Sequence, residues 1–532
     1  MASVKIRFHG AARCVTGSCY ELETEQARIL VDCGLFQGSK SERELNYGAF
    51  PFEPSAIDAV LLTHAHIDHS GLLPKLVKLG FAGPIHATRP SVDLCSVMLP
   101  DSAHIQEVEV ARLNRRNAQR GRDPVTPIYS PRDAADCLTL FRPAEYQTWT
   151  PVAPGIRAQF WNAGHLLGSA SLELEIDRAG ERPLRLLFSG DIGPSFKLLH
   201  PDPQGPTGLD HVFCESTYGN RERPTVSVDE RRAQLAEEVR KAAAVEGPLI
   251  IPSFAVERTQ ELLVDLHLLM QSGEIPSAPI FVDSPLATRA SEIFDRHADE
   301  IEQGDLLRAA LNARRVRFTE TVDQSKAINR FTGFFVVIAA SGMCDAGRIR
   351  HHLKAHLWRR NATVMLAGFQ AQGTLGRILL DGAQRVRIQG EEIDVKARIS
   401  LFDLYSGHAD ASELVSWLQN RGPVSGTIFL THGEETALTA LQARVASLFP
   451  ETRIVAPQLD DLYDLDGVAT CVVEGARPRR LPPEKVARLD WHNDLSKLLL
   501  AISEQVDAAA DERGRAAIIR RLRRALDAEE GG

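Results

Sequence analysis

Thr63-His64-Ala65-His66-Ile67-Asp68-His69 places three histidines and one aspartate within a single short loop. Neutral imidazoles and a carboxylate at this density form a metal-ligand set that suits zinc best. The preceding Ile57–Leu62 predicts a buried strand, and residues 70–77 predict a turn that enters a helix. The loop is therefore expected at the carboxyl end of a strand, where open α/β sheets place their binding sites. A metal centre is favoured over a surface loop that is merely rich in histidine.

Length and composition set the broad class of the protein. The chain has 532 residues, 44% hydrophobic and 25% charged, which suggests two or three globular domains. No apolar run reaches the length of about 18 residues that would predict a membrane span, and Met1–Phe8 resembles a strand rather than a signal peptide. The eight scattered cysteines include no Cys-x-x-Cys pair, which predicts reduced, mostly buried thiols. We therefore expect a cytoplasmic protein. Its net charge of −9 neither requires nor excludes a nucleic-acid partner.

Short apolar segments alternate with longer amphipathic ones almost throughout, which predicts an α/β fold. The expected strands are 28–33, 57–62, 156–161, 171–176, 184–188, 212–215, 248–255, 279–285, 333–341, 362–369, 398–405 and 427–431. Helices are expected over Asp101–Arg122, which is highly charged, and over Asp229–Val245. After Val473 we expect a linker and two amphipathic helices, Leu489–Glu504 and Ala516–Ala528. The arginines of the last helix fit a solvated face as well as an oligomer interface or an RNA contact.

Four other polar residues follow predicted strands and supply the ligands that the histidine loop lacks. His165, Asp191 and His432 each come at or just after the end of an apolar strand, and Asp32 follows another. Strand ends gather at one edge of a sheet, so we expect these side chains to converge on the loop.

In this order along the chain, the motifs resemble the metallo-β-lactamase superfamily, whose fold is an αββα sandwich. The resemblance implies two Zn²⁺ ions, one held by His64, His66 and His165 and the other by Asp68, His69 and His432. Asp191 would bridge the two ions, and Asp32 would orient the site from behind the ligands. Flavodiiron relatives carry glutamate at the position of His66, so histidine here favours zinc over iron. Two cations of this kind clamp the attacking and the leaving oxygens of an in-line displacement.

The long stretch between Asp191 and His408 resembles the β-CASP domain, an α/β insertion in this fold. Glu215, His408 and His432 match the family's motifs A, B and C, and further matches lie at 251–261, 282–287, 340–343 and 373–377. We expect the first part of the metallo-β-lactamase domain over 1–208, the β-CASP domain over 209–397 and the final lactamase part over 398–472. Residues 473–532 would form the linker and a helical extension.

Each motif predicts a chemical task. A departing ribose oxygen needs a proton, so His408 is the candidate general acid. Glu215 would raise its pKa and fix its tautomer, although the two could also form a structural pair where the domains meet. Asp68, Asp191 and Asp32 complete the expected catalytic set. Candidate phosphate contacts at the strand-to-helix turns of the insertion are Ser253, Arg258, Thr259, Ser341, Gly342 and Thr374, with positive charge nearby at Arg348, Arg350, Lys354 and Arg377.

Together these features predict a two-zinc ribonuclease that acts in RNA processing or decay. Family members that act on RNA carry histidine at motif C, whereas those that act on DNA tend to carry valine, so His432 favours RNA. Three alternatives stay open: a DNA nuclease, a hydrolase of a small thioester or lactone, and a scaffold subunit that has no activity. The expected partner is RNA, with a homo-oligomer through the C-terminal helices as a further possibility and no membrane association.

Overall fold

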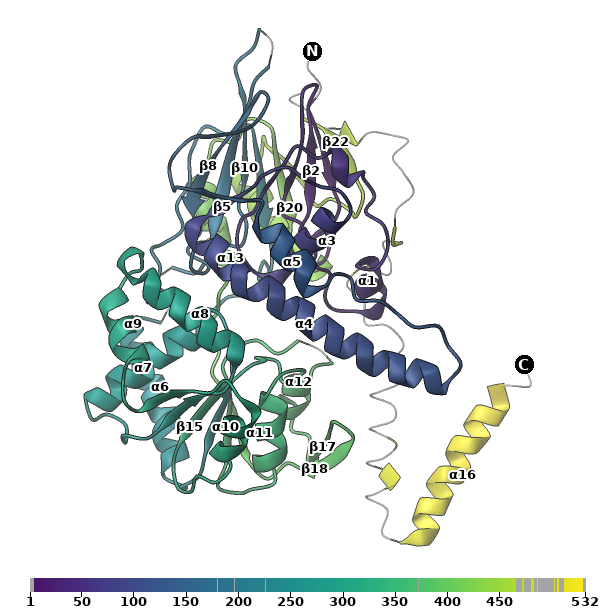
Figure 1. Cartoon of the computed structure of the whole chain (residues 1–532), viewed down its shortest axis with the longest axis vertical. Coiled ribbons are helices and arrows are strands. Elements are labelled where there is room, and N and C mark those ends of the chain that lie inside the picture. Colours follow the sequence, from purple (N-terminus) through teal and green to yellow (C-terminus); the bar gives the residue numbers. More distant parts are fainter. Residues whose placement is uncertain are drawn as a thin grey trace.

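The protein is described here from a computed structural model, which covers residues 4–178, 180–195, 197–224, 226–371, 373–465, 471–472, 480–482, 486, 502, 505–506 and 511–529 (Figure 1). Two mixed sheets face each other in the first of its two domains, hereafter the sandwich domain. The first sheet has the order β23-β22-β1-β2-β3-β4-β5-β6 and the second β21-β20-β11-β10-β9-β8-β7. The strands of the first sheet are β1 (Lys5–Phe8), β2 (Tyr20–Glu23), β3 (Arg28–Val31), β4 (Ala59–Leu61), β5 (Ile85–Thr88), β6 (Phe141–Ala144), β22 (Leu462–Asp464) and β23 (Cys471–Val472). Those of the second are β7 (Thr150–Ala153), β8 (Ile156–Asn162), β9 (Ala170–Ile176), β10 (Leu184–Phe188), β11 (His211–Glu215), β20 (Thr427–Thr431) and β21 (Arg453–Val455).

The core of the sandwich domain lies between these sheets, where Phe8, Phe213 and Phe429 meet in one aromatic cluster. β4 is buried at all of its positions because helices cover the other face of its sheet. The helices on the outer face of the first sheet are α1 (Lys40–Leu45), η1 (Pro54–Ala56), α2 (Ile67–Ser70), α3 (Leu73–Lys78), α4 (Arg89–Gln119) and α5 (Pro131–Leu138). α13 (Ala411–Gln419) and α14 (Glu435–Leu448) cover the second sheet. The result is the expected αββα sandwich.

A second α/β domain, hereafter the inserted domain, carries a six-stranded parallel sheet of order β14-β13-β15-β12-β16-β19. Its strands are β12 (Leu249–Pro252), β13 (Ile280–Val282), β14 (Val316–Phe318), β15 (Val336–Ala339), β16 (Thr363–Leu366) and β19 (Arg398–Leu401). A hairpin, β17 (Arg385–Ile388) and β18 (Glu391–Asp394), stands beside it. The helices are α6 (Val228–Ala243), α7 (Arg258–Gln271), α8 (Pro285–Arg296), η2 (Ala298–Glu300), α9 (Gly304–Leu311), α10 (Val322–Ile328), α11 (Ile349–His356) and α12 (Leu375–Leu380). They cover both faces of the sheet, as a buried parallel sheet requires.

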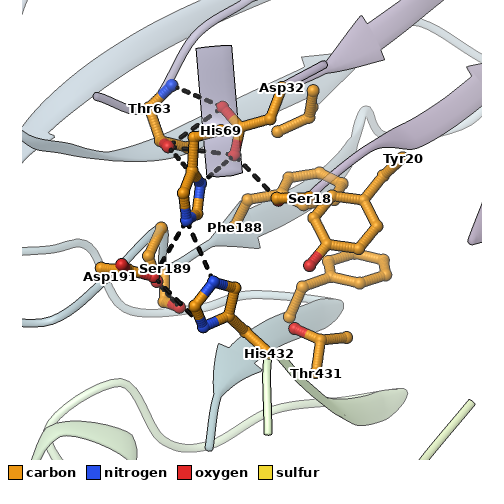
Figure 2. Close-up of a pocket in the computed structure, with 13 residues that line it drawn as sticks. Ser18, Tyr20, Asp32, Thr63, His69, Phe188, Ser189, Asp191, Thr431 and His432 are labelled. Carbon is orange, nitrogen blue, oxygen red and sulfur yellow. Dashed lines mark hydrogen bonds and ion pairs between the residues drawn. The ribbon is translucent and has the colours of Figure 1, made fainter. Parts of the chain in front are cut away.

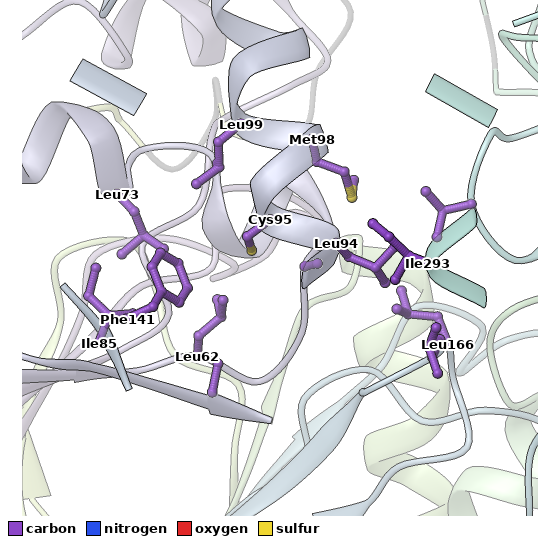
Figure 3. Close-up of a cluster of buried hydrophobic side chains, with 14 of the residues drawn as sticks. Leu62, Leu73, Ile85, Leu94, Cys95, Met98, Leu99, Phe141, Leu166 and Ile293 are labelled. Atoms are coloured by element: carbon purple, nitrogen blue, oxygen red, sulfur yellow. The ribbon is translucent and has the colours of Figure 1, made fainter. Parts of the chain in front are cut away.

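The two domains share a hydrophobic seam where α4 contacts α8. Ile293 of α8 packs among Leu94 and Met98 of α4 and Leu166 of the sandwich domain (Figure 3). Asp93, also on α4, accepts a hydrogen bond from Arg296 at 3.2 Å and lies 2.8 Å from His297 Nε2, both beyond the end of the apolar contact. The seam therefore joins the domains along one side independently of the histidine loop.

Pairing of the strands corrects two expected domain borders. β11 lies beyond the expected border at 208, yet it pairs with β10 and β20 of the sandwich domain. β19 lies beyond the expected border at 397, yet it pairs with β16 of the inserted domain. Both are short strands with parallel partners, and such strands look alike in sequence whichever sheet they join.

Helix lengths also differ from expectation at two places. The charged helix expected from Asp101 is the second half of α4, which begins at Arg89 and retains Pro100 in its interior. Of the two expected C-terminal helices, Leu489–Glu504 lies largely outside the described residues, whereas Ala516–Ala528 lies within α16 (Glu512–Glu529). An oligomer interface through these helices stays a prediction.

Among the described helices, none combines the length and the apolar character that crossing a bilayer requires. The seven cysteines whose side chains are described are all buried and carry free thiols.

Candidate metal centre

The histidine loop leaves β4 and runs into the short helix α2, so its side chains project from the carboxyl end of the first sheet. The second sheet contributes from the same edge: His165 lies in the turn between β8 and β9, Asp191 follows β10, and His432 follows β20. Figure 2 shows His69 and His432 converging with Asp191 beside a small pocket behind the cluster. All seven side chains predicted as ligands are thereby brought to one place.

The first group of potential ligands comprises His64, His66, His165 and Asp191. His66 Nδ1 lies 3.1 Å from both His64 Nε2 and His165 Nε2. Asp191 Oδ2 lies 3.5 Å from His64 Nε2 and 3.6 Å from His165 Nε2. His165 Nδ1 donates a hydrogen bond to Gly407 O at 2.6 Å, so its Nε2 presents a lone pair to the group.

The second group comprises Asp68, His69 and His432. His432 Nε2 lies 3.1 Å from His69 Nε2 and 3.8 Å from Asp68 Oδ2. Asp191 Oδ1 lies 3.3 Å from His69 Nε2. The two oxygens of Asp191 therefore face one group each, which is the position of a bridging ligand.

Electrostatics keep His64, His66, His165 and Asp191 in the protonation states that metal binding needs. Burial lowers the pKa of His66 to about 4 and holds those of His64 and His165 well below the usual value, so these rings are neutral at pH 7. Burial opposes ionisation of Asp191, but His432 and His69 hold its pKa well below the ordinary value. His69 differs, because Asp191 and Asp32 outweigh its burial and raise its pKa.

The donor set fits divalent cations. Within the described residues, imidazole nitrogens approach one another to about 3 Å in each group, and the buried Asp191 Oδ1 makes no hydrogen bond. Ring nitrogens at this separation need a proton or a cation between them, and an unsatisfied buried carboxylate oxygen is costly. Nitrogen and carboxylate ligands of this kind suit zinc.

Asp32 lies behind the cluster rather than in it. It adopts a positive φ of 60° after β3, and its Oδ1 accepts hydrogen bonds from Thr63 N at 2.8 Å and Thr63 Oγ1 at 3.0 Å. Its Oδ2 accepts from Ser18 Oγ at 3.0 Å and from His69 Nδ1 at 2.7 Å. Thr63 and Ser18 were not foreseen, because hydroxyl residues of this kind carry no motif of their own.

Glu215 and His408 meet beside the metal-binding groups, although they are far apart in sequence. Glu215 Oε1 lies 3.2 Å from His408 Nδ1 and accepts a hydrogen bond from Ile192 N at 2.6 Å. Burial lowers the pKa of His408, but Glu215 and Asp191 outweigh it and raise the pKa above the usual value. The centre of the His408 ring lies 4.6 Å from that of His165, with the two rings tilted by 48°, and His408 remains partly exposed. A protonated imidazole can therefore stand at the open side of the cluster.

The six expected phosphate contacts do not behave alike. Ser253 and Thr259 are buried, and Thr259 Oγ1 donates to Phe254 O at 2.6 Å while Ser253 Oγ bonds the same carbonyl. Neither hydroxyl is presented to a ligand, which corrects the expectation: these residues brace the turn that follows β12. Thr374 caps α12 by accepting from Arg377 N.

Ser341 and Arg258 stay available at the carboxyl edge of the inserted sheet, whereas Gly342 is buried. Ser341 and Arg258 are half-buried, and Gly342 lies against the Phe254 ring, which a side chain at that position would meet. Arg258 donates through Nε to Tyr405 O at 2.9 Å.

Aromatic and cationic side chains line the approach to His408, and of these sequence reasoning singled out only Arg258. Tyr218 meets the His408 ring edge-on at 5.7 Å, and Arg221 stacks over Phe369 at 4.1 Å and over Tyr218 at 5.1 Å. On the inserted domain Phe254 is 40% exposed, with the Arg258 guanidinium 4.9 Å from its ring centre. We call Tyr218, Arg221, Phe254, Arg258 and Phe369 the aromatic–arginine strip. Isolated residues of these types give no signal until the fold brings them together.

Three family models match the chain in succession. The metallo-beta-lactamase superfamily matches residues 12–253, the Beta-Casp domain residues 259–379, and the Zn-dependent metallo-hydrolase RNA specificity domain residues 392–457.

Curated relatives cover most of the chain. Ribonuclease TTHA0252 of Thermus thermophilus is 38% identical over 437 residues, which span 81% of this chain and 94% of the relative. The RNase J-like protein of Methanocaldococcus jannaschii is 29% identical over 439 residues, 81% of this chain and 93% of that one. Transcription termination factor FttA of Methanosarcina mazei is 29% identical over 459 residues, 83% of this chain and 69% of the relative.

Proposed function

The chain belongs to the β-CASP family of the metallo-β-lactamase superfamily and is a metal-dependent hydrolase of the nuclease type, and on that premise we propose that it is a two-zinc ribonuclease. It hydrolyses RNA phosphodiester bonds, in RNA processing or decay. The observation that carries the proposal is the complete set of seven potential ligands with the Glu215–His408 pair at its open side. Similarity to a ribonuclease over most of both chains supports RNA as the substrate.

The ligand assignment follows the two groups. His64, His66 and His165 would hold one zinc, Asp68, His69 and His432 would hold the other, and Asp191 would contribute to both groups. Support comes from the contacts of the two Asp191 oxygens, one to each group. When bound, zinc polarises the phosphate and makes a bound water nucleophilic at neutral pH.

The protein's own residues then orient the reactants and move a proton. Asp191 stays ionised and fixes the position of the ligand set, while Asp32 fixes the tautomer of His69. Water that has released one proton to solvent attacks phosphorus in line, and the bond from phosphorus to the 3′-oxygen breaks. His408, held by Glu215 through Nδ1, releases its Nε2 proton to that oxygen, which leaves a 5′-phosphate on the other product.

The aromatic–arginine strip supports a nucleic-acid substrate over a small ester. Exposed aromatic rings stack on unpaired bases, and arginines beside them contact phosphates or add cation–π attraction. Arg221 and Arg258 each lie against an aromatic ring within this approach. A thioester or lactone would need no such strip, so the small-molecule alternative has less support.

A labelled cleavage time course tests the proposal. One RNA, labelled in parallel at its 5′ or 3′ end, is incubated with zinc-loaded protein beside a DNA of the same sequence and an Asp68→Ala control. RNA fragments that are absent from the control are the expected result, and internal fragments or terminal mononucleotides distinguish endonuclease from exonuclease action. Equal or faster cleavage of DNA would support the DNA-nuclease alternative, and no cleavage of either polymer would contradict the proposal.

A further inference from the structure

Glu257 connects the inserted sheet to α7 through a backbone conformation that residues other than glycine seldom adopt. Its φ is 75° and its ψ is −71°. Arg258 N donates to Val256 O at 3.1 Å, which closes a three-residue γ-turn around Glu257. A γ-turn with positive φ at its centre is rare and strained. Strain of this kind persists only where surrounding interactions hold it, and it concentrates at functional sites.

The interactions that hold this turn come from the other domain. Glu257 Oε2 lies 2.7 Å from His200 Nε2, and Oε1 lies 3.1 Å from Lys197 Nζ. All three side chains are buried, and Lys197 and His200 lie in the sandwich domain after β10. Burial opposes ionisation of Glu257, but His200 and Lys197 lower its pKa below the ordinary value. The three groups therefore form a buried, charge-compensated contact between the domains.

Lys197 carries this contact onward to the metal centre. Its Nζ also donates a hydrogen bond to the backbone oxygen of His165 at 2.5 Å. His165 is held from its other side through Nδ1, which donates to Gly407 O. The backbone of one candidate ligand is thus fixed by a lysine whose own position depends on Glu257.

We propose that Glu257 is a positioning residue: its strained turn delivers a carboxylate that holds Lys197 against His165 and so sets the geometry of the first ligand group. This inference rests on the proposed function, because it takes His165 as a metal ligand. Docking of the domains alone does not require the strained turn. The α4–α8 seam, with Ile293 and the Asp93–Arg296 ion pair, already joins the domains elsewhere. The same contact places the amino terminus of α7, and with it Arg258 of the strip, relative to the metal centre.

Zinc affinity of the full-length protein tests the role without relying on cleavage. Dissociation constants are measured by competition with a chromophoric chelator for the wild type, Glu257→Gly, Lys197→Met and the double variant. Glycine adopts the φ of residue 257 without strain, so Glu257→Gly removes the carboxylate while easing the backbone. Asp93→Asn is the matched control, since it breaks an ion pair between the same domains that touches no candidate ligand. Thermal unfolding of the metal-free proteins shows that folded variants are compared.

We expect Glu257→Gly and Lys197→Met each to weaken binding of zinc about 10- to 100-fold, as loss of a residue that supports a ligand does, while Asp93→Asn leaves it unchanged. The double variant should bind zinc no more weakly than the single variant with the lower affinity, because both substitutions act through the backbone carbonyl of His165. Wild-type affinity in Glu257→Gly, or additive losses in the double variant, would overturn the positioning role. If the wild type itself bound no zinc, the proposed function would fail instead, so the two failures are distinguishable.

Discussion

Asp32 Oδ2 accepts a hydrogen bond from His69 Nδ1 at 2.7 Å, while the opposite nitrogen of the same ring lies 3.3 Å from Asp191. A carboxylate behind a ligating imidazole fixes its tautomer and its direction. We therefore expect Asp32→Asn to lower zinc affinity and cleavage by about 10- to 100-fold while the protein stays folded. A zinc titration measures the affinity, and initial rates of RNA cleavage measure the activity. Asp58→Asn is the control, because Asp58 binds Arg28 N in the same sheet and contacts no candidate ligand. Equal effects of the two substitutions would contradict the role of Asp32.

His408→Ala should spare zinc content and reduce RNA cleavage by about 100- to 10,000-fold, the range of a lost general acid. A substrate whose 3′-bridging oxygen is replaced by sulfur separates this role from others, because a thiolate leaves without protonation. The variant should cleave that substrate at nearly the wild-type rate. If His408→Ala slows both substrates equally, His408 is not the proton donor.

Phe254→Ala should raise the KM for single-stranded RNA with little change in kcat, because base stacking on an aromatic ring contributes about 1–3 kcal/mol. Phe254 is 40% exposed beside Arg258 at the carboxyl edge of the inserted sheet. Trp358→Ala is the matched control: Trp358 is 51% exposed but precedes β16, at the opposite edge. Steady-state kinetics on one RNA check both variants, and an unchanged KM for Phe254→Ala would count against the strip as a binding surface.

Removal of metal should destabilise the protein as well as inactivate it, because without cations the imidazoles and the carboxylates are crowded together in a buried cluster. Binding to the folded state alone stabilises by about 2.7 kcal/mol when free zinc is 100 times its Kd. Differential scanning calorimetry before and after chelation, and after zinc is added back, measures the change in Tm. Asp68→Ala should show a smaller shift. An identical Tm with and without zinc would contradict a site in this cluster.

Asp283 should make the stability of the protein fall in acid. Burial would raise the pKa of Asp283, but His352, Ser325, Thr319 and Arg348 hold it well below the ordinary value through hydrogen bonds. Because the pKa is lower in the folded state, the stabilisation is present above the unfolded pKa of about 4 and is lost as pH falls below it.

Asp283→Asn should therefore cost about 3–5 kcal/mol at pH 7, the loss expected when one partner of a buried ion pair is removed. The difference from wild type should shrink as the pH is lowered below 4. Urea unfolding curves at several pH values measure it, and a difference that is independent of pH would show that charge is not responsible.

The sequence by itself determined the αββα sandwich with its insertion, and it placed all seven potential ligands together with Asp32, Glu215 and His408. Asp32, His165, Asp191, Glu215 and His432 lie at or just past the carboxyl end of an apolar strand, and the ends of adjacent strands meet at one edge. His408 precedes α13 instead, and only the resemblance to the family indicated it. The motif His64–His69 also places three histidines and an aspartate close together in the sequence, which few sites other than metal centres require. Such information is contained in short segments and does not depend on knowing which strands pair.

Only the tertiary structure decided which sheet β11 and β19 join, because a short parallel strand carries no local pattern that identifies its sheet. It likewise showed that the hydroxyls of Ser253 and Thr259 form hydrogen bonds within the turn after β12. The aromatic–arginine strip and the contact from Glu257 through Lys197 to His165 join residues from both domains. Contacts of this kind depend on packing between segments far apart in the chain, so no local pattern of residues encodes them.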